Sequence, residues 1–102
     1  MDTYPKKRLE IIIEGPRLSL ILSMLDDLGV SGYTVFPALS GRGQTGSWSE
    51  GMISGANRMV MVLCIANEDA ATKVLEAVQP VLGDGTGIIC ITDAEVLRQD
   101  HF

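Results

Sequence analysis

The chain has 102 residues, of which 46% are hydrophobic, and this is enough for one domain with a hydrophobic core and argues against global disorder. Its net charge of −5 and pI near 4.6 disfavour a nucleic-acid ligand, because proteins that bind nucleic acids usually carry a basic face. No apolar run approaches the ~20 residues that span a bilayer, and the N-terminal MDTYPKKRLE lacks the apolar stretch of a signal peptide. We therefore expect a single domain over residues 1–102, located in the cytoplasm.

Hydrophobic spacing predicts a strand and then a helix at the start of the chain. Residues 7–14 alternate apolar and polar side chains, with Leu9, Ile11 and Ile13 on one face. Gly15-Pro16 marks a break, and a proline suits the first turn of a helix. The helix is expected to end at Gly29, since glycine is a common C-terminal stop. Its apolar face consists of Leu18, Ile21, Leu22, Leu25 and Leu28.

Two further strands are predicted on either side of a long, glycine-rich segment. Residues 33–38 form one strand, and Pro37 indicates that it lies at a sheet edge. Residues 58–66 form the other, and their uninterrupted apolar character is typical of a central strand. The segment between them is longer than the roughly 12–15 residues beyond which structureless loops are usually functional or disordered. We expect the function at the base of this segment or along it.

The last third of the chain predicts a second helix and a fourth strand. Asn67 is a good N-cap for the helix, Pro80 lies at its expected end, and its apolar face consists of Ala71, Val74, Leu75 and Val78. The glycine-rich residues 83–87 predict a tight turn into a strand over 88–92, and Asp93 is expected to cap a short final helical turn. The order β-α-β-β-α-β predicts an α+β, ferredoxin-like fold, in which two helices cover one face of a four-stranded antiparallel sheet.

The third and fourth predicted strands are apolar on both faces, although two helices can cover only one. In the third strand, one face carries residues 59, 61, 63 and 65 and the other face carries residues 60, 62 and 64. In the fourth strand, one face carries Ile88 and Cys90 and the other carries Ile89 and Ile91. A bare apolar face of several hundred Å² is an association surface. The pattern therefore predicts a homo-oligomer that packs sheet backs together, with ligand sites between subunits.

Residues that would carry catalysis or bind a metal are sparse. Cys64 and Cys90 each lie in an apolar run without a nearby ligand partner, so we expect two buried thiols and no disulfide. The single histidine, His101, is expected in an unstructured terminus. The sequence contains no Ser-His-Asp set and no metal-ligand cluster. We therefore expect no enzyme activity, no catalytic residue, no metal and no tightly bound cofactor.

Two glycine-rich stretches are candidate ligand loops. Residues 41–46 match G-x-G-x-x-G formally, but no helix pattern follows, which argues against a dinucleotide fold. Their backbone N–H groups and Arg42 could still bind an anion, and a merely flexible loop is the alternative. Residues 83–87 allow close approach of a backbone to a ligand, and a simple glycine turn is the alternative. Trp48 is either an anchor for a partner protein or a lid that folds back.

Together these features resemble the PII signalling family and its PII-like relatives, which are trimeric ferredoxin-like proteins, over nearly the whole chain. Residues 32–35 and 41–46 are similar to the family's second strand running into its T-loop. Residues 83–85 with Ile88 are similar to its B-loop, and residues 93–98 to the segment leading to its C-loop. The order and separation of these three segments carry the resemblance.

The resemblance implies a regulatory protein that binds an adenine nucleotide in the clefts of a homotrimer. Thr34 and the backbone of Ser40, Gly41, Arg42 and Gly43 would receive the base and sugar. The phosphates would be cradled by Gly83, Asp84, Gly85, Thr86 and Gly87, with Arg42 and Arg98 adding positive charge. The T-loop, with Gln44 and Trp48, would dock a membrane transporter or an enzyme.

Departures from the nitrogen regulators refine this expectation. No tyrosine lies between Ser40 and Gly55, so tyrosyl uridylylation is not expected. Thr86 stands where those proteins place a phosphate-binding lysine, which favours ADP or AMP over ATP with 2-oxoglutarate. The chain also lacks their usual arginine-rich tail. It resembles the PII-like group associated with bicarbonate transport and carboxysomes, in which bicarbonate is a second candidate ligand.

Two other functions fit the same topology. A small acylphosphatase-like enzyme would use Arg17 and Asn57 at a phosphate, but the loop over residues 14–17 is short and glycine-poor for that purpose. An RNA-recognition module would need aromatic residues on its central strands for base stacking, and residues 58–66 contain none.

Overall fold

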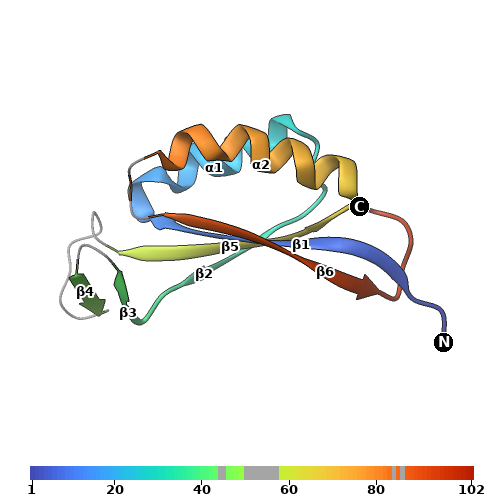
Figure 1. Ribbon diagram of the computed structural model, residues 1–102, viewed down its shortest axis with the longest axis horizontal. Coiled ribbons are helices and arrows are strands. Elements are labelled where there is room, and N and C mark those ends of the chain that lie inside the picture. Colours follow the sequence, from blue (N-terminus) through green and yellow to red (C-terminus); the bar gives the residue numbers. More distant parts are fainter. Residues whose placement is uncertain (44–45, 50–57, 84, 86) are drawn as a thin grey trace.

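The computed structural model describes residues 1–43, 46–49, 58–83, 85 and 87–102. The elements are β1 (Tyr4–Glu14), a 3-10 turn η1 (Gly15–Arg17), α1 (Leu18–Asp27), β2 (Thr34–Pro37), β3 (Ser40–Gly43), β4 (Gly46–Ser49), β5 (Met59–Ala66), α2 (Glu68–Leu82) and β6 (Ile88–Val96). Helices α1 and α2 lie side by side on one face of the main sheet, and no described helix lies on its other face (Figure 1). The predicted α+β, ferredoxin-like fold is confirmed.

The main sheet has the strand order β2-β5-β1-β6, and every neighbouring pair is antiparallel. Strand β5 is therefore central and β2 lies at an edge, as the apolar run and Pro37 predicted. The register places Leu9 opposite both Cys64 and Ile91, so these side chains share the face beneath the helices. Because successive strand residues point to opposite faces, this register determines both faces of the sheet.

The core lies between the sheet and the two helices. The largest fully buried side chains come from β1, α1, β5 and α2, and they include Leu9, Ile11, Ile13, Ile21, Leu25, Val62, Val74 and Val78. Most of them occupy the apolar positions that the strand and helix periodicities predicted. Since burying one such side chain gives about 1.5–3 kcal/mol, these positions dominate the stability of the fold.

The ends of α2 follow local capping rules. The Asn67 side chain accepts a hydrogen bond from the Ala70 N–H at 2.8 Å, which confirms the predicted N-cap. Pro80 lies inside the helix rather than at its end, and α2 continues to Leu82. This is tolerated because a proline in the last turn removes only one helical hydrogen bond. Gly83 ends the helix with φ +45°, a backbone conformation that glycine readily adopts.

Two expected segments differ in the structure. The final helical turn predicted from Asp93 is wrong: β6 extends to Val96, because β1 begins at Tyr4 and the paired strands continue to the Tyr4–Val96 pair. The ion pair between Lys7 and Asp93 also lies on this extension. The long segment after β2 is not wholly irregular, because β3 and β4 pair as an antiparallel hairpin.

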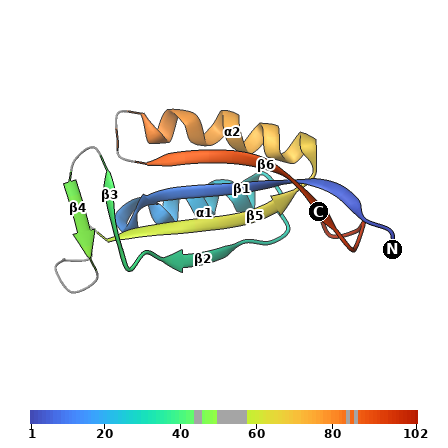
Figure 2. The same ribbon diagram turned by 60° about the horizontal axis from the view of Figure 1, so that its bottom comes forward.

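No described helix covers the second face of the main sheet, the one turned toward the viewer in Figure 2. We call this face the open face, and its apolar side chains are Ile12, Phe36, Met61, Leu63, Ile65, Ile88 and Cys90. The register also places the ion pair of Arg8 and Glu10 on it. Phe36 is 43% exposed and Ile88 is 56% exposed.

Cys64 is buried as predicted, whereas the prediction for Cys90 is wrong in the single chain, because this thiol is exposed on the open face. Among the described helices, none has the length and apolar character needed to cross a membrane.

Candidate ligand site

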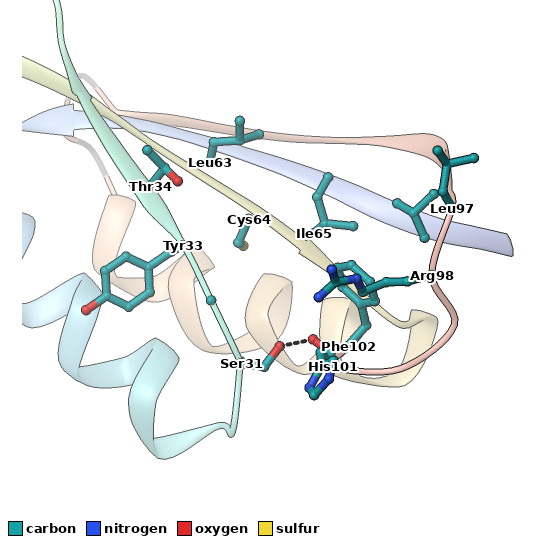
Figure 3. Close-up of a pocket in the computed structure, with 12 residues that line it drawn as sticks. Ser31, Tyr33, Thr34, Leu63, Cys64, Ile65, Leu97, Arg98, His101 and Phe102 are labelled. Carbon is teal, nitrogen blue, oxygen red and sulfur yellow. Dashed lines mark hydrogen bonds between the residues drawn. The ribbon is translucent and has the colours of Figure 1, made fainter. Parts of the chain in front are cut away.

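A pocket of about 810 Å³ lies between the start of β2, the end of β5 and the segment that follows β6 (Figure 3). Its volume falls within the roughly 300–1,000 Å³ of typical small-molecule sites. The lining residues are Ser31, Gly32, Tyr33, Thr34, Leu63, Cys64, Ile65, Val96, Leu97, Arg98, His101 and Phe102. The pocket thus brings together two of the residues predicted from the sequence, Thr34 and Arg98.

The C-terminal segment forms one wall of the pocket because specific contacts hold it against the rest of the chain. The Ser31 hydroxyl donates a hydrogen bond to the main-chain oxygen of His101 (Figure 3). The Asn67 amide donates to the main-chain oxygen of Phe102 at 2.7 Å, and the Lys6 ammonium lies 5.5 Å from the centre of the Phe102 ring. The expectation of an unstructured terminus at His101 is therefore wrong.

The chemistry of the lining suits a flat, partly apolar molecule with negative charge. Leu63, Ile65 and Val96 provide an apolar wall. The Thr34 hydroxyl can donate or accept hydrogen bonds, and the exposed Arg98 supplies a positive charge. The Ser31 hydroxyl already donates to the main-chain oxygen of His101, and the Tyr33 ring points away from Leu63 and Ile65 (Figure 3). Figure 3 shows Thr34 and Arg98 on opposite sides of the pocket.

Cys64 borders the pocket through its place on β5, but its side chain points to the opposite face of the strand from Leu63 and Ile65, beneath the helices (Figure 3). Its side chain is buried, and burial raises the pKa of the thiol from 9.0 to about 11. It therefore stays protonated near neutral pH and behaves as a small apolar side chain.

The other predicted ligand residues lie at the opposite end of the sheet. Strand β6 separates Gly87 from Leu97, and at about 3.3 Å per residue its two ends are roughly 26 Å apart. The end of α2 and the start of β6, which adjoin Gly83 and Gly87, therefore lie far from Arg98, on the side of the molecule that also carries β3 and β4 (Figures 1 and 2). One chain cannot bring all the predicted residues onto a single nucleotide.

The predicted residues of the first glycine stretch lie in β3 or just beyond it. Ser40, Gly41, Arg42 and Gly43 form the strand, and Arg42 is exposed. Trp48 lies opposite Gly41 in the ladder with β4. Gln44, Asp84 and Thr86 lie outside the described residues.

Close packing explains why glycine occupies two positions of the second glycine stretch. The Gly85 N–H donates to the Leu82 carbonyl at 2.8 Å. A Cβ at Gly87 would lie 2.8 Å from a methyl carbon of Leu82 and 3.1 Å from the Ile12 carbonyl oxygen. Gly85 is thus bonded to the end of α2, and Gly87 packs directly on α2 and β1.

The residues of the acylphosphatase alternative do not form an open phosphate site in the part of the chain that the structure describes. Arg17 Nη1 donates to the Val81 carbonyl at 2.8 Å, and Nε lies 3.1 Å from Glu14 Oε2. Asn57 lies outside the described residues. Likewise, no group of three or more His, Cys, Asp or Glu side chains gathers for a metal within the described ranges.

Comparison with known proteins agrees with this architecture. The family model described as "Nitrogen regulatory protein P-II" matches residues 6–101, and the chain therefore belongs to the nitrogen regulatory protein P-II family. The predicted resemblance is confirmed. No match was found among curated proteins.

Solved structures also match over nearly the full length. The PII-like protein CPII from Thiomonas intermedia K12, bound to ADP, AMP and bicarbonate, has 32% identity and a TM-score of 0.87 over 95% of this chain and 92% of that chain. A putative PII-like signalling protein from Thermus thermophilus has 26% identity and a TM-score of 0.78, over 96% and 95% of the two chains. The GlnK–ATP complex of B. subtilis, at 17% identity and a TM-score of 0.65 over 88% and 82%, shares the fold. The predicted PII-like class is confirmed.

Sequence reasoning missed most of the pocket wall. Ser31, Leu63, Ile65 and Phe102 carry no local motif, and they meet only because β2 pairs with β5 while the C-terminal segment folds back over them. The one available signal was the pair of polar residues at the predicted start of the second strand, Tyr33 and Thr34.

Proposed function

We propose that this protein is a homotrimeric regulator that binds ADP or AMP between its subunits and signals through the segment after β2. The observation that carries this proposal is the separation of the predicted ligand residues into two sets at opposite ends of β6. The first set lines the pocket with Thr34 and Arg98, and the second contains residues 40–43 and the glycines of the turn before β6. Two such half-sites in one chain form a complete site when one end of a subunit meets the opposite end of the next.

The open face supports this arrangement. Head-to-tail contacts between unlike surfaces close into rings when the rotation allows, and a three-fold ring uses every half-site. The apolar side chains that no described helix covers, Phe36 and Ile88 among them, would be buried against neighbouring subunits.

In the completed site, each half has a distinct role. The apolar wall of Leu63 and Ile65 would pack against the adenine, and Thr34 would offer it a hydroxyl. Gly87 of the neighbouring subunit's turn would present its backbone N–H to the phosphates, with Asp84 and Thr86 in the same turn. The N–H groups of Gly83 and Gly85 already donate to the Gln79 and Leu82 carbonyls and hold the turn on the end of α2. Arg42 and Arg98 would balance the negative charge of the diphosphate.

The matched structures support the choice of ligand. CPII was solved with ADP, AMP and bicarbonate, and also with ADP and bicarbonate. We propose bicarbonate as a second regulatory ligand of this chain, held by the same cationic groups, Arg42 and Arg98.

No catalytic role is assigned to any residue. The protein would act in the cytoplasm, which is in keeping with its two unpaired cysteines, and would regulate a transporter or an enzyme through Gln44 and Trp48.

Titration calorimetry with ADP, AMP and ATP, each with and without bicarbonate, tests the proposal. We expect micromolar binding of ADP or AMP that weakens on Arg98→Ala by about ten-fold or more, because a hydrogen bond to a charged group contributes roughly 1.5–3 kcal/mol. Lys73→Ala, which removes an exposed cation from the outer side of α2, serves as the control. An absence of binding up to millimolar nucleotide would refute the nucleotide assignment.

A further inference from the structure

Two segments that are distant in the sequence meet at the C-terminal end of α2. One consists of Glu14 at the end of β1 and Arg17 in the turn η1 that follows it. The other is the end of α2, with Val81 and Leu82, and the glycine turn behind it. The Arg17 side chain connects them, although Arg17 belongs to neither the pocket nor the two glycine stretches.

Arg17 satisfies carbonyl groups that the helix leaves without an internal partner. Its Nη1 donates to the Val81 oxygen at 2.8 Å and lies 3.4 Å from the Leu82 oxygen. The last turn of α2 contains no basic residue of its own. A guanidinium at this position both caps the exposed carbonyls and complements the negative end of the helix dipole.

The guanidinium is held from its other side by Glu14. The Nε of Arg17 lies 3.1 Å from Glu14 Oε2, and the arginine side chain is only 37% exposed. A planar guanidinium with donors on both edges can bridge the carboxylate and the carbonyl together, which a lysine ammonium cannot reproduce. The side chain is therefore fixed in one orientation.

Arg17 also lies directly against the glycine turn. The Leu82 carbonyl that it approaches is the acceptor of the Gly85 N–H, at 2.8 Å. A Cβ built on Gly85 would lie 2.8 Å from Nη1 and 3.0 Å from Nη2 of Arg17. The flat guanidinium thus contacts the Gly85 backbone and shares a hydrogen-bond acceptor with it.

We propose that Arg17 is a positioning residue, which holds the Gly85 backbone, in the turn before β6, in the conformation that allows this turn to receive the ligand's phosphates. This inference rests on the proposed function, because it takes that turn to be the phosphate-binding half-site. Glycine-rich backbone samples many conformations, so binding of an anion by its N–H groups is weakened unless another contact selects one of them. Arg17 provides that contact from outside the turn, with its own hydrogen-bonding groups directed to Glu14, Val81 and Leu82.

The test combines amide hydrogen exchange of the turn with ADP titration for Arg17→Ala, Arg17→Lys and the control Lys73→Ala. We expect the Gly85 amide to exchange about ten-fold faster in Arg17→Ala, and ADP to bind about ten-fold more weakly, because apparent affinity falls with the populated fraction of the binding-competent state. Arg17→Lys should fall between wild type and Arg17→Ala, and Lys73→Ala should match wild type. Should Arg17→Ala fail to fold, Arg17→Lys supplies both measurements.

The two readouts separate this inference from the proposed function. Unchanged Gly85 exchange in both Arg17 variants would overturn the positioning role, whatever the affinity for ADP. Faster exchange with unchanged ADP affinity would also overturn it, because the turn would then be irrelevant to the ligand. If wild type binds no nucleotide, the proposed function fails along with the ligand part of the inference, and exchange alone decides whether Arg17 holds the turn.

Discussion

Substitution of Phe36 by aspartate tests whether the open face is buried between subunits. Phe36 lies on the edge strand β2 opposite Met61 and is 43% exposed in the single chain. Because complete burial of a phenylalanine side chain gives about 1.5–3 kcal/mol, assembly gains roughly 1 kcal/mol from each copy. A carboxylate buried there without a partner costs several kcal/mol more. Over three copies the loss is on the order of 10 kcal/mol, which lowers the association constant by about seven orders of magnitude.

The assay is sedimentation velocity at micromolar protein concentration. We expect wild type at three times the chain mass of 11.0 kDa and Phe36→Asp at the monomer mass. Leu20→Asp is the matched control, because Leu20 is 52% exposed on α1, in the layer away from the open face. A Phe36→Asp protein that folds and remains trimeric, or a wild-type protein that is monomeric, would refute the reasoning.

Two further predictions concern stability. Asn67→Ala removes the N-cap of α2 and the hydrogen bond to Phe102, and should lower the free energy of unfolding by about 1–2 kcal/mol in urea titrations; an unchanged midpoint would contradict this. Burial raises the pKa of the Cys64 thiol to about 11, so the native state favours the protonated form. Its contribution to stability should be complete below pH 9 and decline as the pH rises toward 11. Unfolding measured across this range should show a smaller decline in Cys64→Ala, and equal slopes in the two proteins would show that burial does not control this thiol.

Several features of this protein follow from the sequence through local rules. The alternation of Leu9, Ile11 and Ile13 determined which face of β1 is buried, and the spacing of Ile21 and Leu25 did the same for α1. Asn67 specified the start of α2, since a capping side chain needs only the backbone of the next turn. Each of these rules acts between residues near one another in the chain, so composition and spacing are enough to apply them.

The tertiary structure decided the length of β6, the walls of the pocket and the position of Arg17. Strand β6 continues through polar residues to Val96 only because Tyr4 and its neighbours in β1 pair with it, and this long-range pairing overrides the capping signal at Asp93. Arg17 meets Val81 because α1 begins and α2 ends at the same end of the helical layer. Contacts of this kind depend on strand order and register, which no local pattern encodes.

The ligand residues show both sources of information at once. From the sequence, the two glycine stretches were candidate ligand loops, and the resemblance to the PII family implied Thr34 and Arg98 as further ligand residues. Only the tertiary structure showed that the length of β6 holds Arg98 far from the glycines of the turn, because a strand is an extended, rigid spacer. That separation is the physical reason to place the complete site between subunits rather than within one chain.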